Sequence, residues 1–244
     1  MTSEARRRLL EAFRRRDLPG LLTLLVRPIR LVQFERVHIV RASMLDHRPL
    51  LDRLRARASG LSLRIASASD QVELARLFPR DPSRYLEPLR RGDVCMLIDE
   101  GGQAVAIGWV RFDVGAGVEE LGCRLELPGG SCWGYDTYIL PRHRGRGAFA
   151  ALMWEMFNLI RERGRQTVHA SINHLNYASL AAHERLGYST VAVLDRFVLA
   201  RLTVCRLSLP GRGRVWRWIR PDCSAILALS ERHGRHERRQ RRAG

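Results

Sequence analysis

The sequence predicts an α/β fold with a mixed sheet, and three observations support this prediction. Between residues 61 and 204, short apolar runs rich in β-branched and aromatic residues alternate with segments of helical periodicity, which is typical of α/β proteins. The Glu100-Gly101-Gly102-Gln103 turn joins two apolar runs directly, so these runs form a hairpin and the sheet is mixed. A loop of arginine and glycine at residues 141–147 connects a strand to a helix.

Residues 1–60 are expected to form an extension to the main domain. Residues 5–16 could form a basic helix that Pro19 and Gly20 end, and residues 31–40 and 50–57 could add a strand and a short helix. The apolar run 21–26 is far too short to span a bilayer, which takes about 20 residues. Because arginines flank this run, it could lie in a membrane interface, or it could cover part of the main core.

The main domain, residues 61–204, is followed by a basic tail at 205–244. Residues 215–220 interleave tryptophan with arginine, and the end from residue 231 is expected to be disordered. The tail could contact RNA or anionic lipid, or dock as a strand with a solvated end. The elements expected in the domain are a strand at 61–66, helices at 70–78 and 82–91, hairpin strands at 94–98 and 104–112, a strand at 133–140, a helix from residue 148, a strand at 167–172, a helix at 177–185 and final strands near 190–204.

The helix that begins at Ala148 is supported by its periodicity. Its apolar residues recur at helical spacing and form one stripe, and Gly164 follows as a stop signal. The stripe consists of Phe149, Leu152, Met153, Met156 and Ile160.

The loop before this helix has the features of a phosphate-binding site. Gly145 and Gly147 allow a close approach of the backbone to a ligand, and the first amides of the helix favour an anion. A plain strand-to-helix turn is the alternative, because Gly-x-Gly alone is a weak signal. The chain has no lysine, which excludes a P-loop. Ala150 stands where a dinucleotide fingerprint needs its third glycine, and residues 168–172 lack the acidic residue of that fingerprint.

Three ordered motifs resemble the GNAT acyltransferase superfamily. Residues 141–147, Pro-Arg-His-Arg-Gly-Arg-Gly, are similar to its Pro-x-x-Arg-Gly-x-Gly loop. The run Asn176-Tyr177-Ala178-Ser179, followed by residues 183–188, resembles its second signature, and the hairpin with Gly108 resembles its central hairpin. The resemblance covers residues 61–201 and implies a mixed, mainly antiparallel GNAT-type sheet flanked by helices.

The match departs from the family pattern at two positions. Phe149 stands where the family usually has glycine or alanine, and an aromatic residue there still fits a buried first helical turn. The tyrosine that often acts as the general acid toward the departing thiolate aligns with His183.

The resemblance implies direct transfer of an acyl group from acyl-CoA to an amine, without a metal. It also implies that the strands at 133–140 and 167–172 part and that pantetheine lies in the gap. Backbone groups near Ile139 would hold the pantetheine arm and the acyl carbonyl, and the amides of residues 145–149 would hold the pyrophosphate. The residues assigned to acyl-CoA are Ile139, Leu140, Arg144, Gly145, Arg146, Gly147, Ala148, Phe149 and Asn176.

Two proton transfers complete the expected chemistry. His183 could protonate the thiolate, directly or through water, although an imidazole is only partly charged at pH 7; the alternative is that it only packs on its helix. Asp136 is the first candidate for a base that deprotonates the amine, and Glu119, Glu120 and His174 lie in segments that could also reach the site.

Composition limits the partners and the compartment. The five cysteines form no Cys-x-x-Cys pair, which argues against a zinc knuckle, and their odd number without a secretory leader suggests a cytoplasmic protein, one that could lie at the periphery of the inner membrane. The 42 basic residues are all arginine and give a net charge of +17. This field would attract acyl-CoA, an acidic carrier protein or an anionic membrane.

The sequence therefore predicts an acyl-CoA-dependent N-acetyltransferase acting on a small-molecule or peptide amine. One alternative is a long-chain acyltransferase that uses acyl-CoA or acyl-carrier protein at a membrane surface. Another is a catalytically inactive nucleic-acid-binding module of the same fold, because fold does not fix function.

Overall fold

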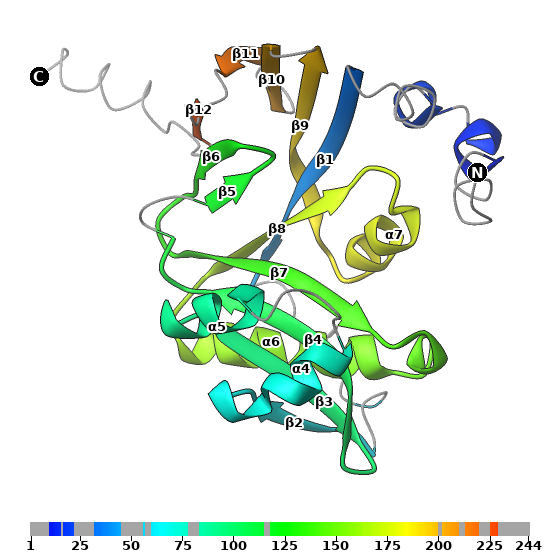
Figure 1. Ribbon diagram of the computed structural model, residues 1–244, viewed down its shortest axis with the longest axis vertical. Coiled ribbons are helices and arrows are strands. Elements are labelled where there is room, and N and C mark those ends of the chain that lie inside the picture. Colours follow the sequence, from blue (N-terminus) through cyan, green and yellow to red (C-terminus); the bar gives the residue numbers. More distant parts are fainter. Residues whose placement is uncertain are drawn as a thin grey trace, which may run out of the picture.

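The computed structural model describes ten parts of the chain, and one large sheet organises them (Figure 1). Among these residues, a nine-stranded sheet runs in the order β11-β10-β9-β1-β8-β7-β4-β3-β2, and a small sheet has the order β12-β6-β5. The mixed, mainly antiparallel α/β fold expected from the sequence is confirmed. The described residues are 10–15, 17–21, 32–44, 56, 60–77, 83–114, 118–199, 202–209, 213–219 and 225–228.

The elements follow the expected order closely. Helices α5 and α7 lie where sequence periodicity placed them, and α6 begins at the expected residue, Ala148. The strands are β1 (Val32–Ser43), β2 (Ser62–Ile65), β3 (Val94–Glu100), β4 (Gln103–Arg111), β5 (Val118–Glu120), β6 (Cys123–Glu126), β7 (Ser131–Ile139), β8 (Thr167–Asn173), β9 (Ser189–Leu199), β10 (Leu202–Leu209), β11 (Gly213–Ile219) and β12 (Ala225–Ala228). The helices are η1 (Ala68–Asp70), α4 (Gln71–Leu77), α5 (Ser83–Arg90), η2 (Pro141–His143), α6 (Ala148–Glu162) and α7 (Tyr177–Arg185).

The large sheet consists of two half-sheets that β7 and β8 join only briefly. These two strands are parallel and pair from Ser131 with Thr167 to Gly134 with Ala170. Beyond that point β7 stays with β4 as far as Ile139, whereas β8 stays with β1 as far as Asn173. The parting of the strands expected from the family resemblance is confirmed.

A β-bulge bends β7 where the strands part. The pairing of β4 with β7 shifts between Ile107 and Trp109, so Gly108 lies opposite the extra residue. Asp136 in the bulge has a φ of 46°, a left-handed conformation that aspartate tolerates better than most residues. Because bulges increase local twist, this one turns the end of β7 away from β8.

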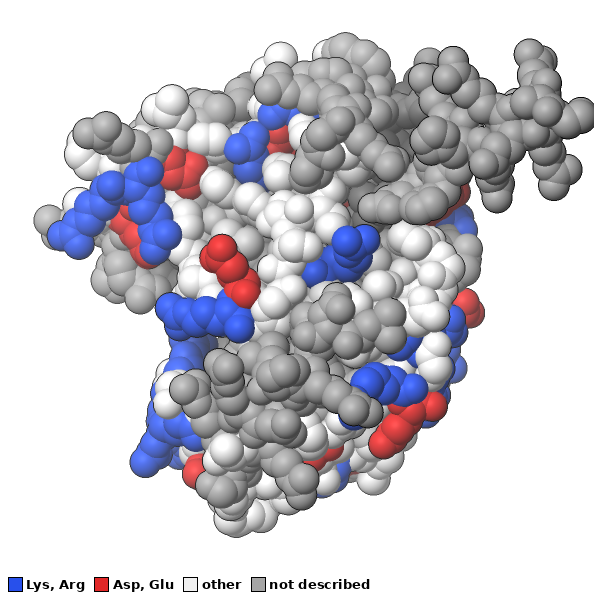
Figure 2. Space-filling view, turned by 180° about the vertical axis from the view of Figure 1, so that it is seen from behind, with Lys and Arg blue, Asp and Glu red and all other residues white. Residues whose placement is uncertain are grey.

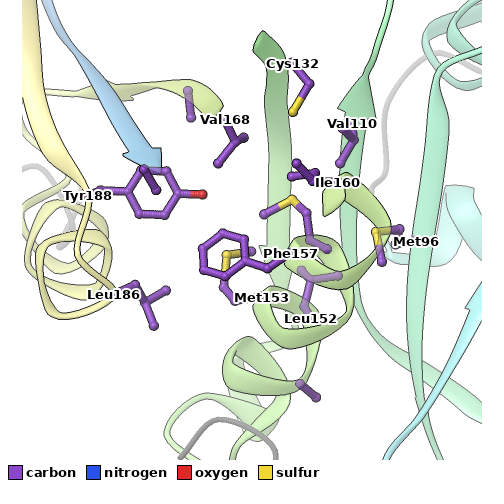
Figure 3. Close-up of a cluster of buried hydrophobic side chains, with 14 of the residues drawn as sticks. Met96, Val110, Cys132, Leu152, Met153, Phe157, Ile160, Val168, Leu186 and Tyr188 are labelled. Atoms are coloured by element: carbon purple, nitrogen blue, oxygen red, sulfur yellow. The ribbon is translucent and has the colours of Figure 1, made fainter. Parts of the chain in front are cut away.

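Helix α6 supports the sheet from one face and forms the main core (Figure 3). Its buried side chains meet residues from both sides of the β7–β8 junction, including Val110, Cys132 and Val168. A Cβ on Gly108 would lie 3.0 Å from a methyl group of Leu152, so the strand glycine lets α6 approach the sheet closely.

The opposite face is covered in two parts. Helices α4 and α5 lie over β3 and β4 and bury Leu74, Leu77 and Tyr85. The hairpin β5–β6 lies over the other half-sheet, where Cys123 and Leu125 pack against residues of β1, β9 and β10. Strand β12, near the C-terminus, pairs in parallel with β6 and extends this cover.

Strand β1, from the part of the chain expected to be an extension, lies in the middle of the large sheet. It pairs antiparallel with β8 on one side and with β9 on the other. A buried ion cluster stabilises this arrangement, because Asp195 on β9 accepts hydrogen bonds from Arg36 on β1 (2.5 Å to Nε) and from Arg206 on β10 (2.9 Å to Nε). One carboxylate thus links three neighbouring strands.

Several expectations fall on parts of the chain outside the described residues. They are the short helix at 50–57, most of the apolar run at 21–26 and the disorder of the final residues from 231 onward. Within the described residues, no helix is long and apolar enough to cross a membrane.

We predict that Asp195→Ala lowers the free energy of unfolding by about 3–5 kcal/mol, because it leaves two partly buried guanidinium groups without their anion. Burial by itself would raise the pKa of Asp195, but the hydrogen bonds from Arg36 and Arg206 outweigh burial and hold the pKa below its usual value. The carboxylate therefore contributes its full stabilisation above about pH 4, and loses it as the pH falls through the lower folded-state pKa.

Urea unfolding of the wild type and the variant as a function of pH measures both effects. Glu126→Ala is the matched control, because Glu126 is an exposed carboxylate on a strand, and it should change the free energy of unfolding by less than about 0.5 kcal/mol. An equal loss in both variants would contradict the role given to Asp195.

Candidate active site

The gap between β7 and β8 presents backbone groups that neither strand uses. The N–H of Leu140 donates to Val105 O in β4 over 3.0 Å. Because successive peptide groups in a strand point in opposite directions, those of Ile139 face the gap instead. The carbonyl of Ile139 accepts a hydrogen bond from Arg144 Nε (3.2 Å), while its N–H remains directed into the gap.

The loop that follows β7 is fastened to the neighbouring hairpin. His143 is buried, and its Nδ1 lies 2.7 Å from a carboxylate oxygen of Glu100 at the end of β3. Arg142 Nε donates to His143 Nε2 over 2.9 Å. Gly145 and Gly147 have φ values of 75° and 95°, which side chains rarely adopt. The loop is therefore held in a shape that depends on its two glycines.

The first turn of α6 has the features expected of an anion-binding site. Gly147 is the N-cap and no side chain caps this end, so the amides of residues 148–150 have no acceptor within the helix. Arg142, Arg144 and Arg146 are exposed around the same loop, and the helix dipole adds to their positive charge. These features fit the pyrophosphate of an acyl-CoA.

The residues predicted to bind acyl-CoA fall into two groups. Ile139, Leu140 and residues 144–149 lie together at the end of β7 and the start of α6. Asn176 lies on the far side of the gap and is exposed as the N-cap of α7, where its side chain accepts the N–H of Ser179 (3.2 Å). Its side-chain oxygen therefore stabilises the start of α7.

His183 is buried among aromatic rings. Its ring centroid lies 5.6 Å from that of Phe149 on α6 and 4.9 Å from that of Tyr188. Its Nδ1 lies 2.8 Å from Ser179 O, and a carbonyl only accepts, so Nδ1 carries the proton. Burial lowers the pKa of His183, and the hydrogen bond to Ser179 opposes this only in part. Only Nε2 could exchange a proton with a ligand.

Glu120 contacts β8 near the point where the strands part, and two other carboxylates lie close enough to influence it. Glu120 at the end of β5 accepts a hydrogen bond from the Ser171 hydroxyl on β8 (2.5 Å). Burial raises the pKa of Glu120, and the charges of Glu35 on β1 and Asp136 on β7 raise it further. Glu35 is also 3.0 Å from Arg196 Nη1 on β9. Asp136, the first candidate for the base, thus lies near Glu120, which sequence reasoning had named among the alternatives.

His174, another of the alternatives, takes part in a different set of contacts. His174 lies after β8, where its Nε2 is 2.7 Å from Asp17 and its Nδ1 is 2.8 Å from His38 Nε2. It therefore connects the N-terminal segment to the body of the protein. The side chain of Glu119 falls outside the described residues.

Sequence and structure comparisons agree with this geometry. The model of the Acetyltransferase (GNAT) family matches residues 64–188. The GNAT glucosamine N-acetyltransferase region of a fungal multi-domain GH3 β-N-acetylglucosaminidase has a similar fold, with a TM-score of 0.53 and 18% identity over 73% of this chain and 23% of that one. A tandem GNAT protein from the clavulanic acid biosynthesis pathway has a TM-score of 0.49 and a sequence identity of 16%. The match covers 74% of this chain and 55% of that one. No curated protein matches the sequence.

A mixed sheet whose two halves part beside an amide-rich loop at the start of a helix defines an acyl-CoA-dependent transferase fold. The family match spans just over half of the chain. The protein belongs to the GNAT acetyltransferase family.

We predict that Gly147→Asp abolishes binding of acetyl-CoA, because it places a carboxylate and a Cβ where the phosphates approach the first turn of α6. Isothermal titration calorimetry measures the effect, and we expect affinity to fall at least about a hundredfold, equivalent to about 2.7 kcal/mol.

Gly164→Asp is the matched control for this variant. Gly164 follows the other end of α6, has a φ of 67° and has open space around its Cβ position, so it carries the same backbone strain and the same charge change. Equal binding by wild type and Gly147→Asp would contradict the phosphate site.

Proposed function

We propose that this protein transfers an acetyl group from acetyl-CoA directly to a primary amine. The observation that carries this proposal is the position of the gap, which has an anion-binding loop at one end and a group of carboxylates on one face. If the pantetheine arm of acetyl-CoA lay between β7 and β8, its acyl carbonyl could accept a hydrogen bond from the N–H of Ile139. Such positioning of the reacting carbonyl can account for several kcal/mol of the barrier.

The carboxylates favour an amine acceptor. Glu35 on β1 and Asp136 on β7 both act on the carboxyl of Glu120 on β5, and Arg196 pairs with Glu35. A protonated amine would be attracted to this negative field. The identity of the acceptor beyond its amine group is open to experiment.

Glu120 is the proposed general base. It belongs to the β5–β6 hairpin, and the hydrogen bond from Ser171 holds its carboxylate beside β8, one of the two strands that border the gap. An ammonium group is a poor nucleophile, so a proton must leave before nitrogen attacks the thioester carbonyl. A carboxylate with a raised pKa is a stronger base than an ordinary one, which suits it to this transfer near neutral pH. Asp136 would act beside it by holding the amine.

His183 stays the predicted proton donor for the departing thiolate. With Nδ1 held by Ser179, a proton could leave only from Nε2 and only from the imidazolium form. Since burial lowers the pKa of His183, this form is scarce at pH 7, and donation would depend on a proton supplied during the reaction, such as the one released from the amine.

The preferred length of the acyl chain distinguishes this proposal from its alternative, a long-chain acyltransferase. We expect acetyl-CoA to bind and react, and a long-chain acyl-CoA to do so at least about tenfold less well. Calorimetry and release of free thiol with each donor measure this preference. A preference for the long chain would favour a lipid-modifying acyltransferase instead. Binding of neither donor would contradict the use of acyl-CoA and leave an acyl-carrier protein donor or a nucleic-acid-binding module as the surviving hypotheses.

We predict that Glu120→Gln lowers kcat by about 10²–10⁴-fold, because the amide cannot accept the amine proton. In the wild type, kcat/KM should fall as the pH drops through the raised pKa of Glu120, above the usual value of about 4.3. The variant should lose this acidic limb while still binding acetyl-CoA.

Glu126→Gln is the matched control for Glu120→Gln. Glu126 lies on the same hairpin but is exposed, and its variant should keep the wild-type pH profile. An unchanged acidic limb in Glu120→Gln would assign the base to another group, with Asp136→Asn as the next variant to measure.

A further inference from the structure

The N-terminal helical segment presents its large apolar side chains to solvent. Leu10, Phe13 and Leu18 are 53%, 73% and 76% exposed. The residues of the same segment that face the protein are small, because Ala12 and Gly20 are buried. A segment that covered a core would have the reverse arrangement, so these side chains do not serve the packing of this domain.

Specific contacts hold the segment in this orientation. The carboxylate of Asp17 accepts the N–H of Gly20 (2.9 Å) and the hydroxyl of Tyr177 (2.5 Å), and it lies 2.7 Å from His174 Nε2. A Cβ on Gly20 would lie 2.9 Å from a methyl group of Leu175, so the segment lies directly against the chain before α7. The outward direction of Leu10 and Phe13 is therefore fixed by the body of the protein.

Other exposed apolar residues lie at the same end of the molecule. Leu199 and Leu202 flank the turn between β9 and β10, and both are exposed. In Figure 1 this turn and the N-terminal helical segments occupy the top of the view, whereas α4, α5 and β2 lie in its lower half. Among the described residues, only two further large apolar side chains, Ile65 and Val72, are exposed, and they lie in that lower half.

The segment that carries the exposed apolar residues is basic. Arg14 and Arg15 are exposed on it, and Figure 2 shows arginine side chains together with acidic ones at this corner, the upper left of the view from behind. Asp17 faces inward, and Glu11 pairs with Arg15 (3.2 Å), whose guanidinium also lies 4.6 Å from the centroid of the Tyr177 ring. Arg14 therefore adds positive charge that Glu11 does not offset. The adjoining sequence continues the pattern with arginines at 6–8 and an apolar run at 21–26.

We propose that this surface, formed by Leu10, Phe13 and Leu18 with Arg14 and Arg15, docks on an anionic lipid bilayer. Short segments that combine leucine and phenylalanine with arginine bind at the boundary between headgroups and acyl chains. The arginines would pair with lipid phosphates, and the apolar side chains would enter the outer acyl region. A second copy of the chain is a poorer occupant, because two such surfaces would bring their arginines together.

Sedimentation with lipid vesicles tests this proposal on the full chain. We expect the wild type to bind vesicles of phosphatidylglycerol and phosphatidylcholine, to bind pure phosphatidylcholine much less, and to be released by salt. Leu10→Ser/Phe13→Ser should weaken binding about tenfold or more, since two side chains lose their apolar environment.

Val72→Ser is the matched control, because Val72 is 85% exposed and lies on α4 away from the surface; it should bind vesicles as the wild type does. Binding of acetyl-CoA should be the same in all three proteins, which separates this test from that of the proposed function.

Three results would overturn the proposal. The first is that the wild type does not bind vesicles. The second is that Leu10→Ser/Phe13→Ser binds vesicles as well as the wild type does, which would assign the interaction to arginines elsewhere in the chain. The third is that light scattering shows a wild-type dimer, and that this double variant dissociates the dimer without any effect on vesicle binding.

Discussion

The parting of β7 and β8 is the constraint on which the rest of the structure depends. Each strand keeps one neighbour, β4 or β1, so half of its backbone groups beyond Gly134 and Ala170 face a gap instead of a strand. Residues 135–139 of β7 are half-buried or exposed, so a ligand with its own donors and acceptors along its length could reach these groups and pair with them. The bulge at Asp136 and the close packing of α6 on Gly108 both serve to hold this opening.

Strand β1 gives the second half-sheet its shape and part of its chemistry. It pairs with β8 from Thr167 to Asn173 along the edge opposite to β7, and Ile39 pairs with Ser171, the residue that holds Glu120. It also carries Glu35 to the group of carboxylates. The family match begins only at residue 64, so Glu35 and the rest of β1 come from a segment outside the matched residues. The ion cluster at Asp195 holds that segment in the sheet and thereby supports the site indirectly.

Local signals in the sequence predicted the helices and strands well. They did not predict which strands pair over long distances in the chain. Helix α7 has a side-chain cap at Asn176 and a glycine with positive φ at 187, and both act within a few residues. The position of β1 between β8 and β9 depends on pairing over more than 100 residues, which periodicity does not encode. For the same reason the sequence offers Glu120 only as one alternative among several, because its hydrogen bond to Ser171 joins residues 51 positions apart.

The net charge of the chain did not predict the charge of the region proposed to bind the acceptor amine. The net charge of +17 suggests anionic partners, and the arginines around η2 suit the phosphates of the donor. Glu35 on β1 and Asp136 on β7 nevertheless add negative charge around Glu120. Screening weakens interactions between exposed charges over about 8–10 Å, so each substrate would respond mainly to the charges nearest to it. A basic protein could in this way bind a polyanion and a cation at one site.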